Sequence, residues 1–285
     1  MKKDEIRIHV LHCGMVHTTK YLPFDTGGAS QLKVAGIGVP EKDWVWMPVS
    51  AYYIEHPKGR VLVDTGWNRR ISPDGKLDRK AQIKDFGRII YSLNQGVLPA
   101  GMAVDEQLAR LGVTPAELDY VLITHLDCDH VCGVDQVKDA RHILVSEEEF
   151  ISDRKFSPVN RIRFQKRWWE NVELTLFPWS GSEGPFRKSY DLFGDGSIQL
   201  INIPGHSAGL FAVKVTGSDG RFVLITSDGA YGARSWEEMI LPGVAQNREH
   251  QRLSLEWIRE QAFDKNCVEC LANHDTEVKP HVITL

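Results

Sequence analysis

The sequence predicts an α+β protein with the architecture of an αββα four-layer sandwich, in which two sheets pack together and helices cover their outer faces. Two observations predict it. Short strand-like runs dominate both halves of the chain, and helical segments follow them in each half. A chain of 285 residues, 42% of them hydrophobic, can bury a core of this size, and no linker separates the halves. We therefore expect a single domain over residues 1–285.

The first half begins with the β-rich runs IRIHVLHCG, VSAYYIEH and RVLVDTG, of which the last two are joined by a Pro-Lys-Gly turn as in a hairpin. A helical stretch follows from about Leu77 to Leu93, and VDEQLARLGV is a second one. Thr114 before Pro115 has the pattern of a further helix start. YVLIT then has the composition of a buried strand.

The second half repeats this order. RHILV is a predicted strand, and SEEEF begins a helix with Ser146 as its cap. SIQLINI, LFAVKVT and RFVLITS are three further strands separated by glycine-containing turns. EHQRLSLEWIREQAF is amphipathic at the helical period, and CVECLAN is the last predicted strand, directly before His274.

The composition excludes several classes of function. The net charge of −4 and the pI of about 6.3 provide no basic field for nucleic acid. The start of the chain is a poor secretion signal, and no apolar run approaches the roughly 18 residues of a membrane helix. We expect a cytoplasmic protein with a small-molecule substrate and without nucleic-acid or membrane partners. The sequence leaves monomer and dimer open.

The cysteines are odd in number, which argues against a disulfide framework. They are Cys13, Cys128, Cys132, Cys267 and Cys270. A redox or zinc-ribbon role for the single CxxC would need a second pair or a thioredoxin-like context, so we expect cysteines packed as small hydrophobic residues.

Residues of the metal-ligand type follow the predicted strands. They are Asp64 in VLVDTG, His125, Asp127, Asp129 and His130 in THLDCDH, His206 in PGHSAG, Asp228 in TSDGAY and His274 in ANHD. Each alone is unremarkable, since a histidine after a strand is more often a loop or core residue. Imidazole and carboxylate are ligands of zinc, iron and manganese, however, and burying this cluster without a cation would be costly. The set therefore predicts a metal site.

In this order the residues resemble the metallo-β-lactamase superfamily. VSAYYIEHPKGRVLVDTGWN, THLDCDHVCGV, TSDGAY and NHDTEVKP are most similar to its N-acyl homoserine lactonase family. The resemblance implies the αββα fold and a metal-bound hydroxide that opens a lactone ring, with N-acyl homoserine lactone as the leading substrate. It also implies two divalent metal ions, for which zinc is expected. The first would be held by His125, Asp127 and His206, the second by Asp129, His130 and His274, with Asp228 between them.

The resemblance gives roles to further residues. Tyr231 matches a tyrosine that hydrogen-bonds the lactone carbonyl, although a packing role at this turn is the alternative. Asp64 fits a position that orients a metal-binding histidine through its other ring nitrogen. Asp129 could give a proton to the leaving alkoxide.

Asp127 departs from the pattern, which has histidine at this position. A carboxylate is shorter than imidazole and adds a negative charge, which favours iron or manganese. Since every other ligand position is filled, we interpret the site as retuned rather than lost. A carboxylate there is also similar to the diiron oxidoreductases of the same superfamily, although a flavin module has no room in this chain. Hydrolysis of another ester, a thioester or a phosphodiester is the other alternative.

The segment RIRFQKRWWENVELTLFPW, residues 161–179, mixes basic residues with three tryptophans. It could be a cap over the cleft, but we favour a surface helix with its aromatic side chains turned inward. The basic run is too short to support a nucleic-acid role by itself.

Overall fold

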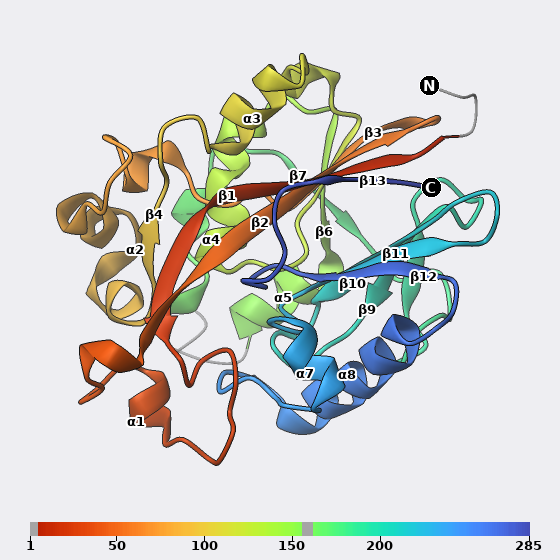
Figure 1. Cartoon of the computed structure of the whole chain (residues 1–285). Coiled ribbons are helices and arrows are strands. Elements are labelled where there is room, and N and C mark those ends of the chain that lie inside the picture. The colour runs from red at the N-terminus through yellow and green to blue at the C-terminus, as the bar shows by residue number, and fades with distance from the viewer. Residues whose placement is uncertain (1–4, 156–161) are drawn as a thin grey trace.

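The computed structural model describes residues 5–155 and 162–285. Two β-sheets lie face to face at its centre, with α2, α3 and α4 on the outer side of one and α7 and α8 on the outer side of the other (Figure 1). This arrangement confirms the predicted αββα sandwich.

The first sheet has the strand order β13-β1-β2-β3-β5-β6-β7, with β4 paired to β1. Its strands are β1 (Arg7–Thr19), β2 (Trp44–His56), β3 (Gly59–Val63), β4 (Gln95–Val97), β5 (Tyr120–Leu122), β6 (His142–Ser146), β7 (Leu174–Phe177) and β13 (Val282–Thr284). The hairpin of β2 and β3 is confirmed, with His56 opposite Gly59. Because β3, β5, β6 and β7 are parallel neighbours, their carboxyl ends meet at one edge of the sheet.

The second sheet has the order β12-β11-β10-β9-β8. Its strands are β8 (Ser189–Asp191), β9 (Ile198–Asn202), β10 (Phe211–Thr216), β11 (Phe222–Ser227) and β12 (Cys267–Ala272). Successive side chains of β11 alternate between two cores: Val223 and Ile225 pack between the sheets, whereas Phe222 and Leu224 pack toward the helices. This sheet is therefore buried on both faces.

The described residues form the helices α1 (Gln31–Val34), α2 (Arg79–Leu93), α3 (Val104–Arg110), α4 (Cys128–Val131), α5 (Glu147–Lys155), α7 (Ala233–Glu237) and α8 (Arg248–Ala262), and the 3-10 helices η1 (Glu41–Asp43), η2 (Arg69–Ile71), η3 (Pro115–Glu117), η4 (Cys132–Val137) and η5 (Lys166–Trp168). Ser146 accepts a hydrogen bond from the Glu149 amide and begins α5, as predicted. The predicted helix start at Thr114 gives only η3, and α2 is interrupted at Gly87, where φ is 82°.

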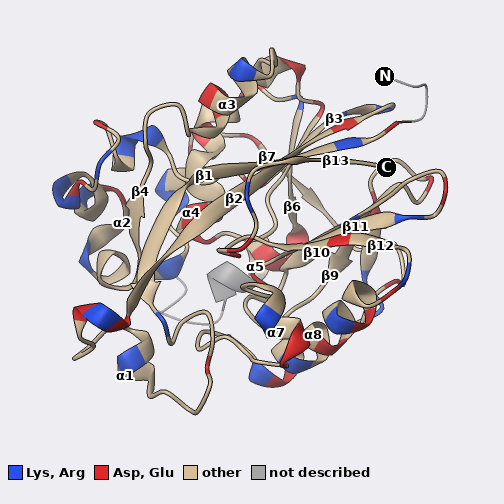
Figure 2. Ribbon diagram, in the orientation of Figure 1, with Lys and Arg blue, Asp and Glu red and all other residues tan. Residues whose placement is uncertain are grey.

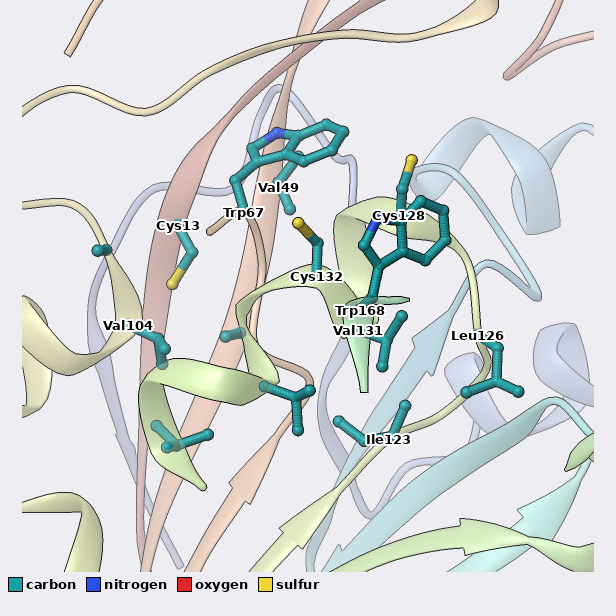
Figure 3. Packing of buried hydrophobic residues seen from close by; sticks show 14 of the residues in the cluster. Cys13, Val49, Trp67, Val104, Ile123, Leu126, Cys128, Val131, Cys132 and Trp168 are labelled. Atoms are coloured by element: carbon teal, nitrogen blue, oxygen red, sulfur yellow. The ribbon is translucent and has the colours of Figure 1, made fainter. Parts of the chain in front are cut away.

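The prediction of a surface helix over residues 161–179 is wrong. Among its described residues only Ile162 and Arg163 are in an α-helix; the segment then forms η5 and β7, which joins the edge of the first sheet. The inward orientation of the tryptophans is confirmed for Trp168 and Trp169, which are buried, and the Trp168 indole donates to Asp85. Figure 3 shows Trp168 packed near Cys128 and Cys132. All five cysteines are free, as expected.

Charged residues lie on the outer helices and loops, and both signs are mixed there, whereas the strands carry few of them (Figure 2). No helix in the described part of the chain is long and apolar enough to cross a membrane.

Candidate metal centre

The predicted ligands follow strands whose ends meet at one edge of the sandwich. Asp64 follows β3, the motif from His125 to His130 follows β5, and Asp228 and His274 follow β11 and β12. His206 lies in the loop between β9 and β10. The fold thus brings together residues that are up to about three quarters of the chain apart in sequence.

Two groups of side chains could each hold a metal ion, and in each group the ligand atoms lie within 4.8 Å of one another. The first group contains His125, Asp127, His206 and Asp228, and the second contains Asp129, His130 and His274. All seven residues are buried except Asp127, of which about 15% of the side chain is exposed. The sequence predicted the same residues, with Asp228 between the two sets instead of in the first.

Asp228 faces both groups. Its Oδ2 lies 3.5 Å from His206 Nε2 and 4.0 Å from His125 Nε2. Its Oδ1 lies 3.2 Å from both His130 Nε2 and His274 Nε2. One carboxylate oxygen is therefore turned to each group, as a bridging ligand requires.

The donor set fits metal ions. His125 Nε2, His130 Nε2 and Asp228 Oδ1 are buried and have no hydrogen-bond partner within residues 5–155 and 162–285. Leaving such polar atoms unsatisfied costs about 1–3 kcal/mol each. Imidazole nitrogens and carboxylate oxygens that converge without hydrogen bonds are arranged as ligands for a cation.

The neighbouring residues orient the imidazole rings. His130 Nδ1 lies 2.8 Å from Asp64 Oδ2, and His274 Nδ1 lies 2.8 Å from the Pro48 carbonyl oxygen. These contacts direct each Nε2 toward Asp228. Asp64 has φ of 57°, in the left-handed region, and is held there by hydrogen bonds from the amide and hydroxyl of Thr124.

Imidazole–carboxylate attraction dominates the electrostatics. Burial alone would lower the pKa of His130, but Asp228 and Asp64 outweigh it and raise that pKa well above its usual value. Burial likewise acts to raise the pKa of Asp228, yet His274 and His130 hold it well below its usual value. Protons on the histidines thus balance the negative charge of the carboxylates, and a bound cation would compete with these protons.

Arg163 is a site residue that the sequence reasoning missed. Its Nε and Nη2 donate to the two oxygens of Asp127 at 2.5 and 2.6 Å. Its Nη2 also lies 2.6 Å from His206 Nε2, and its Nη1 donates to the His206 carbonyl at 3.0 Å. Burial acts to raise the pKa of Asp127, but the Arg163 guanidinium outweighs it and holds the pKa well below its usual range.

Tyr231 lies beside the two groups. Its hydroxyl donates to Asp228 Oδ2 at 2.7 Å, and its ring stacks on His274 at 5.3 Å between centroids. The side chain is almost fully buried. The phenol is therefore a polar group of the site as well as a packing element.

A cavity of about 830 Å³ opens over the two groups. Its floor includes Asp127, Asp129, Arg163, His206, Asp228, Tyr231 and His274. Its walls include the apolar side chains of Val16, Leu22, Val34, Met47, Ile90 and Leu93. A polar floor under apolar walls suits a small molecule with one reactive polar end and one apolar chain.

The comparisons with known proteins agree with this geometry. The Metallo-beta-lactamase superfamily model matches residues 44–233. N-acyl homoserine lactonase AttM of Rhizobium johnstonii is 30% identical over 202 residues, which cover 69% of this chain and 70% of that protein. N-acyl homoserine lactonase AttM of Rhizobium radiobacter is 27% identical over 233 residues, with coverages of 81% and 83%.

Solved structures show the same fold. An N-acyl homoserine lactone hydrolase with the product N-hexanoyl-L-homoserine bound at its catalytic metal centre has a TM-score of 0.71 and 19% identity, covering 95% of this chain and 94% of its own. AidC, a dizinc quorum-quenching lactonase, has a TM-score of 0.65 and 12% identity, with coverages of 97% and 90%. The matches in sequence and fold together place this chain in the metallo-beta-lactamase superfamily and, within it, in the N-acyl homoserine lactonase family.

Proposed function

We propose that this metallo-beta-lactamase superfamily hydrolase opens the lactone ring of an N-acyl homoserine lactone. The observation that carries the proposal is the convergence of two ligand groups on Asp228 at the floor of an apolar-walled cavity. The names of the curated relatives and the homoserine products bound in similar structures support this substrate class.

We propose divalent metal ions at the two groups, with zinc as the ion of the second. The two buried histidines of the second group, with Asp129 and the neighbouring Asp228, suit zinc, and the similar lactonase AidC is described as a dizinc enzyme. In the first group the carboxylate of Asp127 favours iron or manganese. When bound, metal ions of this kind supply a Lewis acid for the carbonyl and activate water near neutral pH.

The residues of the chain itself bind and orient the substrate. The Tyr231 hydroxyl donates a hydrogen bond to Asp228 in this structure. With substrate bound, it is placed to donate to the oxygen on which negative charge develops when the ring carbonyl is attacked. Asp129 lies on the cavity floor, where it can pass a proton to the departing ring oxygen. Apolar walls accommodate the acyl chain and exclude water.

Acid release from lactones tests the proposal. Purified protein should release acid anaerobically from N-hexanoyl and N-decanoyl homoserine lactone, followed with a pH indicator. The rival diiron oxidoreductase would instead need a reductant and would show visible iron absorption after oxidation. A metal-loaded protein that releases no acid from either lactone would contradict the proposal.

A further inference from the structure

The two ligand groups differ in their contacts with Arg163, which binds side chains of the first group. On the side of the second group, His130 Nε2 and Asp228 Oδ1 have no hydrogen-bond partner among the residues described, so they are free to bind an ion. In the first group, His125 Nε2 and His206 Nδ1 are the nitrogens without such a partner. Both oxygens of Asp127 and the Nε2 of His206 already contact the Arg163 guanidinium.

These contacts use the atoms that a metal ion would need. His206 Nε2 lies 2.6 Å from Arg163 Nη2 and 2.8 Å from Asp127 Oδ2. The arginine–carboxylate pair therefore engages this nitrogen in either tautomer, as an acceptor from the guanidinium or as a donor to the carboxylate. The two-pronged contact with Asp127 is the strong geometry for an arginine–carboxylate pair. The pair is mostly buried, with 17% of the Arg163 side chain and 15% of the Asp127 side chain exposed, so water weakens it little.

The charges compensate as well. Replacing a histidine by Asp127 adds one negative charge to the first group, and Arg163 adds one positive charge directly beside it. The guanidinium thus provides, inside the protein, the positive charge that an ion would otherwise bring. A second cation at this place would be repelled by Arg163 unless the side chain moved away.

We propose that Arg163 competes with a metal ion for the first group, so that the chain binds one ion tightly through the second group and Asp228, and a further ion only weakly. The inference rests on the proposed function, since it concerns the metal ions of the same site. The first ion position is filled only when the guanidinium releases Asp127 and His206.

Zinc titration of chelator-treated protein against a coloured competing chelator tests this. The unmodified chain should show one tight site and one weaker site. Arg163→Leu frees Asp127 and His206, so the weaker site should tighten by at least about tenfold, the scale on which neighbours of metal ligands change affinity. Arg167→Leu is the matched control, because Arg167 is exposed and donates to the Lys84 carbonyl outside the site.

A second variant keeps the test decisive if Arg163→Leu does not fold. The double variant Asp127→His with Arg163→Leu supplies three imidazoles without an unpaired carboxylate and should bind two zinc ions tightly. Two equally tight sites in the unmodified chain, or no tightening in either variant, would overturn the inference. Two tight sites together with lactone hydrolysis would overturn this inference and leave the proposed function standing. A chain with no tight zinc site would contradict both.

Discussion

Among the described residues, Asp228 is the side chain that faces both ligand groups, with one oxygen turned to each. Asp228→Ala should therefore lower lactone hydrolysis to background and reduce the zinc content of the purified protein. Asp219→Ala is the control, because that carboxylate is exposed and pairs with Arg221. Elemental analysis and acid release are the measurements. An Asp228→Ala variant with full metal content and activity would show that the shared carboxylate is not a ligand.

Tyr231 allows a separate test of transition-state stabilisation. Tyr231→Phe removes only the hydroxyl that contacts Asp228, so the ring can still stack on His274. We expect kcat to fall on the order of a hundredfold, the scale of losing one oxyanion donor, with metal content unchanged. An unchanged kcat would show that Tyr231 contributes packing and does not stabilise the transition state.

The residues that the sequence predicted as ligands come together in the structure, because each follows a strand and has the side-chain type that metal ions bind; their role as ligands stays a prediction. Arg163 was missed because nothing in its local sequence distinguishes it from the other basic residues of the segment 161–179. Its role depends on a contact with Asp127, which is 36 positions earlier in the chain. Pairing across such a separation is set by the fold and cannot be read from periodicity or spacing.

At the scale of elements, Glu149 of α5 joins the two ligand-bearing loops. Its carboxylate accepts from the amides of Leu126, within the first motif, and Gly209, within the His206 loop. Burial raises the pKa of Glu149 from 4.5 to about 7, against hydrogen bonds that lower it. The loops that hold His125 and His206 are therefore tied through one buried acid.

This pKa predicts how stability depends on pH. Between about pH 4.5 and pH 7 the folded state keeps a proton on Glu149 that the unfolded chain releases, so the free energy of unfolding falls as pH rises through this window, by about 3 kcal/mol. Glu149→Gln cannot titrate and should lose this slope. Urea unfolding at several pH values measures it, and Glu148→Gln is the control. Equal slopes in Glu149→Gln and the unmodified chain would contradict the prediction.

The elements with strong periodicity were predicted best. The runs that became β1, β2, β3, β10 and β11 were identified because they are rich in β-branched and aromatic residues and are bounded by turns, and α8 was identified because one face of it is buried. The segment 161–179 was assigned wrongly as a helix, since LTLF pairs with β6 as the edge strand β7. Short apolar runs fit either period, and only the neighbouring strand decides between them.

At the scale of the whole molecule, the four layers and the position of the site at the strand ends could be predicted from the sequence, whereas the contacts of Arg163 within the site depend on the fold. The organisation as a single domain over residues 1–285 and the cytoplasmic location stay predictions, as does the choice between monomer and dimer. Limited proteolysis and sedimentation are direct tests of the first and the last.

Metal removal and return is the measurement that tests the central claim most directly. Protein stripped with a chelator and dialysed should lose acid release from N-hexanoyl homoserine lactone, and added zinc should restore it, because the buried histidines and Asp228 need a cation to act on the substrate. Hydrolysis that persists in the stripped protein, or that fails to return although zinc is bound, would contradict a metal-dependent lactonase at this site.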